Sequence, residues 1–396
     1  MKKSPRNSDI RLLDGRWYQR EPLDDYRWMR DEAPVFWDEE GELWGVSRHD
    51  DVMFVSRNPE LFCSAKGSRP DSSVPSMINM DDPGHKRHRN LVNRGFTPRQ
   101  LALQEAKARE VCVELIEKVA PRGECEFVHE VAAPLPMVMI GDMLGVEPED
   151  RDTLLRWSDD LLRTSGSDDP KDIQAAAQAG LGWFEYAQRV IEDRRANPRD
   201  DLLSLLVHGE VDGERLSDEA IQHETLLILV GGDETTRHVI TRSAEMLIRH
   251  PEQRRKLADD PAKLPVAVEE MLRWVSPIKN MNRTATRDTE LRGQKIREGD
   301  RLLLLYHAAN LDERVFERAD HFDVERDPNP HVAFGGYGTH HCLGASLARM
   351  ELRVMFEELL ARLPDLELAS DEPLPLRRNN FIVGIEEMPV RFSPRP

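Results

Sequence analysis

The sequence FGGYGTHHCLG, residues 334–344, decides how the rest of the chain is interpreted. It combines a short glycine-rich loop with a single cysteine, Cys342, and a helical apolar pattern runs from Leu343 to Leu363 directly afterwards. The loop therefore presents Cys342 at a helix N-terminus. The helix dipole and free N–H groups there favour an anion, so we expect a lowered thiol pKa and a thiolate that serves as ligand or nucleophile.

Three interpretations of this cysteine compete. A buried structural cysteine in a glycine-rich turn is common, because free cysteine is among the most buried residue types. A metal site formed by His340, His341 and Cys342 is disfavoured, because adjacent side chains rarely converge on one ion and no usual zinc spacing surrounds them. Axial thiolate ligation of haem iron requires a cysteine presented in this way.

The pattern G-x-G-x-H-x-C-L-G, residues 336–344, resembles the haem-binding loop of cytochromes P-450, the haem-thiolate monooxygenases. It departs from the family at Gly335, where an aromatic residue is usual, and Phe334 stands one position earlier. The extra glycine is similar to that of a bacterial steroid and branched-lipid subgroup. The resemblance implies haem b with Cys342 as the iron ligand. It also implies that the haem is contacted by Phe334, Gly336, His340 and Gly344.

Length, charge and composition restrict the other possibilities. The chain has 396 residues, a formal charge of −18 and 32% charged residues, which gives no support to nucleic-acid binding. No signal-peptide pattern and no apolar run long enough to span a membrane is found. Four widely spread cysteines fit a reducing cytoplasm. We expect one domain over residues 1–396, with 1–14 as a flexible tail, and a monomer.

The longest predicted helix runs from Ser217, a good N-cap, to about His250, before Pro251. Its middle, GGDETT over residues 231–236, opposes helix propensity and predicts a local widening or kink that opens a groove for O₂. A kinked packing helix, with Thr235 bonded back to a carbonyl, is the alternative.

The segment GGDETT also resembles the family's oxygen-activation motif. The resemblance implies that Thr235 and Glu234 carry protons toward the bound oxygen, with Asp233 beside them and Gly232 against the haem.

Two further segments carry cationic groups. His85 and Arg89 share one helix face at i and i+4, a spacing that can clamp carboxylates but is more often solvated charge. The resemblance assigns His85, Arg89, Arg283 and His340 to the haem propionates. Basic residues between 86 and 94 make this segment similar to a docking face for an acidic electron donor.

A helix over residues 265–273 carries Glu270 and Arg273 at i and i+3. As a lone surface pair they would contribute little. They resemble the family's Glu-x-x-Arg signature, in which the pair meets a downstream arginine, here Arg326. The implied role is structural, bracing the cysteine loop.

The resemblance spans roughly residues 15–393 and implies a mainly α fold with a small β region. The haem would lie between the long central helix and the helix that follows Cys342. Apolar residues elsewhere predict a lipid pocket made of Val74, Met77, Ile78, Leu229, Val230, Val275, Ile278, Met281, Phe381 and Ile382.

The implied reaction is monooxygenation, with O₂ as co-substrate and electrons passing from NAD(P)H through a separate ferredoxin reductase and ferredoxin. Residues 132–136, 140–146, 155–161 and 232–238 look closest to actinobacterial enzymes that oxidise the terminal methyl of a sterol side chain. Cholesterol or cholest-4-en-3-one is therefore the expected substrate. A fatty acid, a terpenoid or a macrolide would suit the same apolar residues. A peroxide-driven haem enzyme, a haem-based sensor and a haem-free binding protein remain as other classes.

Overall fold

The computed structural model describes residues 9–69 and 74–395. Its helices are α1 (Gly15–Gln19), α2 (Leu23–Glu32), α3 (His49–Arg57), α4 (Gly84–Val92), α5 (Pro98–Val119), α6 (Pro134–Leu144), α7 (Arg151–Leu162), α8 (Pro170–Ala196), α9 (Leu202–His208), α10 (Asp218–Arg249), α11 (Pro251–Asp259), α12 (Leu264–Val275), α13 (Tyr306–Asn310) and α14 (Ala345–Arg362). Its strands are β1 (Val35–Asp38), β2 (Leu43–Val46), β3 (Phe62–Cys63), β4 (Glu124–Glu126), β5 (Glu210–Val211), β6 (Glu214–Arg215), β7 (Asn280–Ala285), β8 (Thr289–Leu291), β9 (Gln294–Ile296), β10 (Arg301–Leu305), β11 (Glu367–Leu368) and β12 (Pro389–Arg391).

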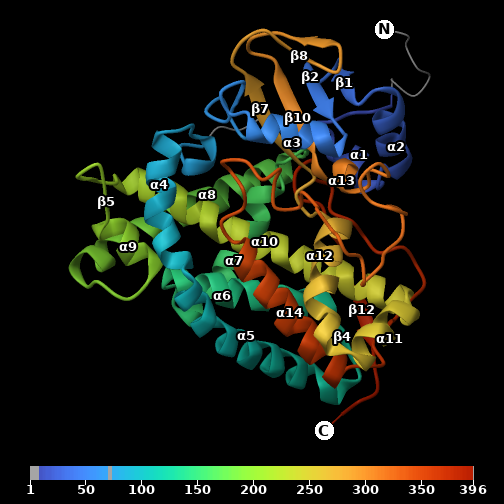
Figure 1. Cartoon of the computed structure of the whole chain (residues 1–396). Helices are drawn as coiled ribbons and strands as arrows, with labels where there is room; N and C mark the ends of the chain where they lie inside the picture. The colour runs from blue at the N-terminus through green and yellow to red at the C-terminus, as the bar shows by residue number, and fades with distance from the viewer. Residues whose placement is uncertain (1–8, 70–73, 396) are drawn as a thin grey trace.

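The main sheet lies with α1, α2 and α3 at one end of a larger helical body, which also carries β5 and the pair β4 and β12 (Figure 1). The sheet has the order β1-β2-β10-β7-β3, so the N-terminal hairpin β1–β2 joins strands that lie far along the chain. β10 pairs parallel to β2 and antiparallel to β7. The predicted fold class, mainly α with a small β region, is confirmed.

The N-terminal segment is partly packed. Residues 1–8 of the expected tail lie outside the described residues. Ile10 and Leu12, in contrast, are buried in a cluster with Trp17, Tyr26 and Leu303. Their burial ties this part of the chain to the sheet region, because apolar side chains removed from water stabilise the contact.

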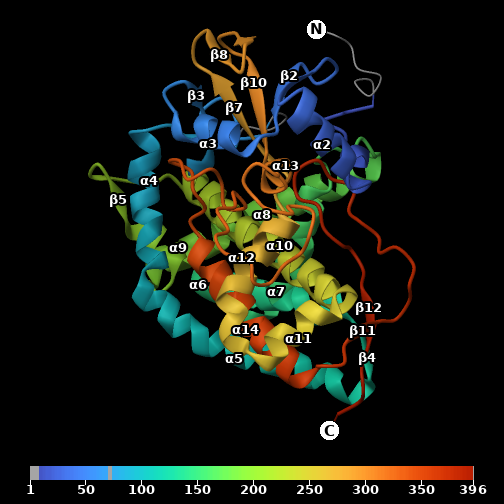
Figure 2. The ribbon, with the colours of Figure 1, turned by 45° about the vertical axis from the view of Figure 1, so that its right-hand side comes forward.

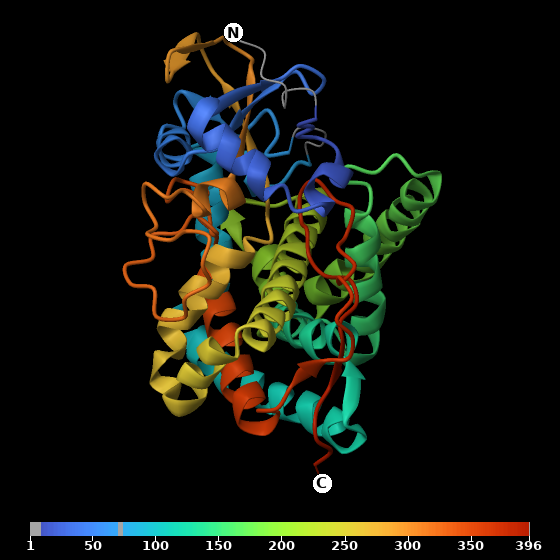
Figure 3. The ribbon, with the colours of Figure 1, turned by 90° about the vertical axis from the view of Figure 1, so that its right-hand side faces the viewer.

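The long helix α10 crosses the helical body and contacts α6, α7, α12 and α14 (Figures 2 and 3). Ser217 caps it by accepting from the Ala220 N–H at 3.2 Å, and Pro251 follows its C-cap His250, as predicted. The predicted widening is wrong: α10 is continuous through GGDETT. Close packing explains Gly232, since a Cβ there would lie 2.8 Å from Cγ1 of Ile140 on α6.

Within residues 9–69 and 74–395, none of the helices is both long enough and apolar enough to cross a lipid bilayer.

Candidate active site

A cavity opens between α10, α14 and the glycine-rich loop that precedes α14. Its wall is formed by α4, α6, α10, the segment from α12 to β7, the start of α13, the loop with the start of α14, and residues 77–78 and 96 on either side of α4. The predicted site residues on its wall are His85, Arg89, Gly232, Thr235, Arg283, Phe334, His340, Cys342 and Gly344. These residues are spread over 260 positions of sequence, and the fold brings them to one space.

The accessible part of the Cys342 side chain faces this cavity. Its backbone N–H donates to the Phe334 carbonyl at 2.9 Å, which closes the loop into a turn just before α14. Gly335 lies at φ +95°, a conformation that favours glycine. Burial raises the pKa of the Cys342 thiol, against the opposing N–H groups of Gly344 and Ala345. The lowered pKa predicted from the helix N-terminus is therefore wrong for the chain alone.

Gly336 is the predicted contact that lies off the cavity wall. A Cβ on Gly336 would lie 2.4 Å from Oγ of Ser56, and one on Gly338 would lie 1.8 Å from the Ser56 carbonyl oxygen. Both glycines have ordinary φ angles, so they are required for close contact with the end of α3 rather than for backbone freedom. The loop is thus seated directly on α3.

Phe334 lines the cavity from the loop side, and the Arg349 guanidinium carbon lies 4.6 Å from its ring centroid. Arg349 in turn is held by Glu269 through contacts of 2.6 and 2.8 Å. The ring therefore occupies a fixed place beside Cys342 in spite of the extra glycine.

Two arginines on the cavity wall have no carboxylate partner in the described part of the chain. Arg89 donates to the carbonyls of Thr339 and His341, at 3.4 and 2.5 Å. Arg283 donates to the Asn282 carbonyl at 2.7 Å. Burial lowers the pKa of the Arg89 guanidinium, because a buried charge without a counter-charge is costly. Two unpaired cations and one thiol on the same wall fit a haem, whose propionates would supply the missing negative charge.

His85 and His340 lie beside these arginines, with ring centroids 4.1 Å apart. His340 contacts the Met80 carbonyl at 3.1 Å, and burial lowers its pKa to about 3. Burial also lowers the pKa of His85. Both rings are therefore neutral at pH 7 and are not cations toward a carboxylate. The single N–H of neutral His340 is donated to the Met80 carbonyl, so of the two rings His85 has the N–H that can donate to a carboxylate.

Thr235 lies on the cavity wall and donates its hydroxyl to the Gly231 carbonyl at 2.8 Å. This back-bonded rotamer is the alternative considered for Thr235 from the sequence, and here it occurs within an uninterrupted α-helix. Gly231, Thr235 and Thr236 all border the cavity, so the polar turn of α10 faces the same space as Cys342.

Glu234 points away from the cavity into a buried charge cluster. Its Oε2 accepts from Arg237 at 2.7 Å and from Arg377 at 2.9 Å, and both arginines also contact Asp159. Burial by itself would raise the pKa of Glu234, yet Arg237 and Arg377 hold it well below its usual range. Glu234 is therefore an ionised carboxylate at neutral pH, and it is not part of the cavity wall.

Asp233 and Glu351 form a second carboxyl pair across α10 and α14. Burial raises the pKa of Asp233 well above its usual range, and the charge of Glu234 raises it further. Burial raises the pKa of Glu351 to about 8, and Asp233 adds to this shift. Glu351 lines the cavity, although the sequence did not identify it. Its place in the charged run of α14 resembled a solvated helix face, so no local signal could have distinguished it.

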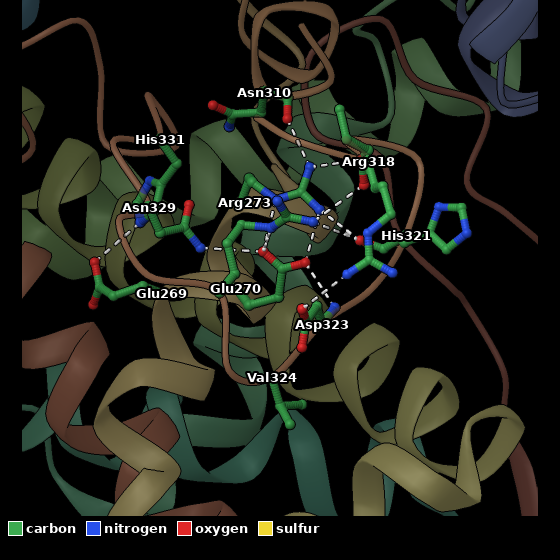
Figure 4. A network of polar contacts seen from close by, with 12 residues as sticks. Glu269, Glu270, Arg273, Asn310, Arg318, His321, Asp323, Val324, Asn329 and His331 are labelled. Carbon is green, nitrogen blue, oxygen red and sulfur yellow. Dashed lines mark hydrogen bonds and ion pairs between the residues drawn. The ribbon is translucent and has the colours of Figure 1, made fainter. Parts of the chain in front are cut away.

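The predicted pair Glu270 and Arg273 is fully buried (Figure 4). Arg326 joins this pair as expected. Glu270 accepts from Arg273 at 2.7 Å through both oxygens and from Arg326 at 3.0 Å. Arg273 also donates to the carbonyls of Asn310 and Ala319, at 2.8 and 2.9 Å. The network thus ties α12 to the irregular segment that leads into the cysteine loop.

The predicted lipid pocket is only partly placed on the cavity. Met77, Ile78, Ile278 and Met281 line it. Outside its lining lie Val74, Leu229, Val230, Val275, Phe381 and Ile382. Val74 is exposed, Leu229 and Val275 belong to core clusters, Phe381 lies under Arg69, and Ile382 bridges to Ile278.

Other apolar residues take their place on the wall. These include Phe96, Ile140, Leu227, Ile228, Val239 and Leu272. Leu227 and Ile228 precede the predicted pair on α10, because an all-round apolar run does not reveal which side of a helix faces a cavity.

The metal site considered for His340, His341 and Cys342 has no support. Over residues 9–69 and 74–395 no group of three His, Cys, Asp or Glu side chains is arranged to hold a metal ion.

The cytochrome P450 family model matches residues 53–391, and the chain belongs to this family. The chain is 51% identical over 392 residues to the steroid C26-monooxygenase of Mycobacterium tuberculosis, with 98% of each chain covered. It is 41% identical over 377 residues to the methyl-branched lipid omega-hydroxylase of the same organism, covering 92% of this chain and 87% of the relative.

Solved structures agree with this assignment. A cytochrome P450 of Mycobacterium marinum in complex with pseudoionone is 32% identical with a TM-score of 0.91, covering 99% of this chain and 100% of that one. One from Bacillus megaterium in complex with testosterone is 32% identical with a TM-score of 0.88, covering 95% and 99%. Family membership establishes haem as the cofactor, with a cysteine thiolate as iron ligand and O₂ as co-substrate.

Proposed function

We propose that the protein is a monooxygenase that hydroxylates the terminal methyl of a sterol side chain, with cholesterol or cholest-4-en-3-one as substrate. The proposal rests on the 51% identity to a steroid C26-monooxygenase over nearly the whole chain. The apolar part of the cavity wall, which includes Met77, Ile78, Leu227 and Met281, supports a substrate with little polar surface.

Cys342 is the iron ligand in this proposal, and Arg89 and Arg283 bind the propionates with help from His85. When bound, haem supplies the O₂ activation and C–H oxidation that side chains cannot perform. The chain holds the cofactor between α10 and α14, and its apolar wall orients the substrate and excludes bulk water.

Proton delivery falls to the polar turn of α10 and its neighbours. Thr235 exposes a hydroxyl to the cavity, and Glu351 holds a proton at pH 7 on the same wall. Glu234 is ionised and links this turn to Arg237 and Arg377, so it can accept and pass on a proton from the outer side. Asp233 precedes Glu234 on α10, and its charge acts on Glu351 of α14.

Electrons come from NAD(P)H through a separate ferredoxin reductase and ferredoxin in the cytoplasm. The basic residues of α4 support an acidic donor on this face. Lys86 is exposed there, and Arg87 forms an exposed ion pair with Asp212 at 2.7 Å.

A spectral titration of the haem-loaded protein tests the substrate. We expect cholest-4-en-3-one and cholesterol to shift the Soret band toward the high-spin form, and turnover to add one oxygen at the terminal side-chain methyl by mass spectrometry. A shift with methyl-branched fatty acids alone would replace the sterol by the substrate class of the second relative.

Two controls separate the other classes. Cys342→Ser is expected to abolish the red-shifted Soret band of the reduced, CO-treated protein. Product formation with H₂O₂ alone, at the rate seen with ferredoxin, would indicate a peroxide-driven enzyme. A CO complex without any turnover would indicate a sensor.

A further inference from the structure

A second cavity, of about 270 Å³, lies on the far side of the segment that joins α12 to β7. Ile278 of this segment borders the active site, whereas Val275 and Lys279 border the second cavity. The second cavity lies where α2 and α13 meet the end of α12 (Figure 1). Much of its wall is apolar, formed by Leu23, Trp274, Leu311, Leu376, Val383 and Ile385.

Lys279 brings a buried amine to this wall, with only 8% of the residue exposed. Its Nζ donates to the Val275 carbonyl at 2.9 Å and contacts Nδ1 of His307 at 3.4 Å. No carboxylate in the described chain lies within ion-pair distance of it. Burial lowers the pKa of Lys279 to about 7, as expected for an ammonium removed from water without a counter-charge.

In the described part of the chain, the other charged side chains on this wall are ion-paired, apart from the solvent-exposed Asp24; Arg27, for example, contacts Glu313 and Asp320 at 3.4 Å each. Arg242 pairs with Glu21 at 2.6 Å, and Arg30 pairs with Glu313 at 3.1 Å. The fully buried hydroxyl of Tyr26, on the same wall, has no hydrogen-bond partner among the described residues. Among the described residues, the cavity wall therefore contains one buried amine without a carboxylate partner and one unused hydroxyl donor.

A purely structural role accounts for only part of this arrangement. The Val275 carbonyl ends α12, so the Lys279 amine caps that helix favourably. A carbonyl dipole, however, does not neutralise a buried charge. Helix capping also explains neither the cavity nor the unused hydroxyl of Tyr26.

We propose that this second cavity binds a small organic carboxylate, with Lys279 as its counter-ion and Tyr26 as a hydrogen-bond donor. A carboxylate accepts from both groups, whereas a cation would meet an ammonium and a neutral alcohol would leave the charge unbalanced. The volume and the apolar wall restrict the ligand to a compact apolar body, such as an aromatic ring or a short alkyl chain. This site is independent of the oxidation substrate.

Binding through the charged amine makes affinity depend on pH. The ligand selects the ammonium form, so affinity is highest below about pH 7, where Lys279 is protonated, and falls as pH rises above that value. Burial keeps the pKa of His307, the titratable ring that contacts Lys279, well below its ordinary value, so His307 stays neutral over this range. The remaining charged side chains on the wall are Glu21, Asp24, Arg27, Arg30, Arg242, Glu313 and Asp320.

Isothermal titration of the haem-loaded protein with benzoate and hexanoate, against benzyl alcohol as neutral isostere, tests the site. We expect saturable heat with the acids only, weaker at pH 8 than at pH 6, and no change in the Soret band. Lys279→Met should weaken binding about tenfold or more, and Tyr26→Phe about two- to tenfold. Lys263→Met, an exposed lysine paired with Glu325 at 2.6 Å, should leave binding unchanged.

Tyr26→Phe removes a hydroxyl that contacts no described partner, so it folds normally and keeps the test informative if Lys279→Met does not. Absence of saturable heat with either acid would overturn the proposal. So would binding that is unaffected by Tyr26→Phe and Lys279→Met, or binding that shifts the Soret band and competes with the oxidation substrate.

Discussion

Two buried charge networks lie within the helical body, and they differ in how completely their polar atoms are used. In the network around Glu270, both carboxylate oxygens and the three guanidinium nitrogens of Arg273 have partners. In the cluster around Glu234, one carboxylate oxygen of Glu234 and both oxygens of Asp233 have none among the described residues.

This difference separates a structural role from a chemical one. A fully bonded network fixes one geometry and has no site for another proton. Carboxyl groups with free oxygens and opposite pKa shifts, such as Asp233 and Glu234, are suited to hold and move protons. We therefore propose that the Glu270 network positions the cysteine loop and that the Glu234 cluster serves the reaction.

The largest effect is expected from Arg273→Met. It leaves the Glu270 carboxylate buried without its main partner, which should lower the free energy of unfolding by about 3–5 kcal/mol and the amount of haem retained. Chemical denaturation and haem content measure both. Arg109→Met, at a half-exposed pair with Glu358, should cost no more than about 1 kcal/mol. Equal losses of unfolding free energy in the two variants would contradict the special structural role of the Glu270 network.

A smaller change in stability but a large change in rate is expected from Glu234→Gln. If Glu234 relays protons, turnover should fall on the order of 10²-fold while the substrate-induced Soret shift persists. Asp159→Asn is the matched control, since it removes one negative charge from the same two arginines. An equal fall in turnover with Asp159→Asn would assign the effect to charge balance.

Thr235→Ala should change the fraction of electrons that end up in product more than it changes the rate of NAD(P)H consumption. Loss of the hydroxyl on the cavity wall is expected to lower product per NAD(P)H about three- to tenfold, with the difference appearing as peroxide. Thr241→Ala removes the same kind of back-bond, to the Arg237 carbonyl at 2.9 Å, away from the cavity. Unchanged coupling in Thr235→Ala would contradict a role in proton delivery.

A pH-dependent effect on stability is expected from Glu351→Gln. The raised pKa means that the folded chain keeps a proton that the unfolded chain releases. The stabilisation is complete below pH 4.5 and is lost as pH rises toward 8. The free energy of unfolding of the variant, minus that of the parent, should therefore increase by about 1–3 kcal/mol when the pH is raised from 5 to 7. Thermal unfolding at both pH values measures it, and a constant difference would place Glu351 in solvent.

The sequence identified those parts of the site that depend on short-range pattern. The loop before Cys342, the caps of the long helix and the pairing of Glu270 with Arg326 all follow from local spacing or from a family signature. The side of α10 that faces the cavity did not, because residues 226–230 are apolar all round. Continuity of α10 at Gly232 and the burial of Glu351 depend on neighbours, α6 and Asp233, that only the tertiary structure brings near.

The close approach of Gly338 to the Ser56 carbonyl oxygen implies that the position of α3 determines the position of the cysteine loop. Any side chain at Gly338 would force the loop away from α3 and would displace the Cys342 sulfur with it. Swapping the N-terminal segments between related enzymes would thus alter the electronic environment of the iron without changing a single residue that touches it.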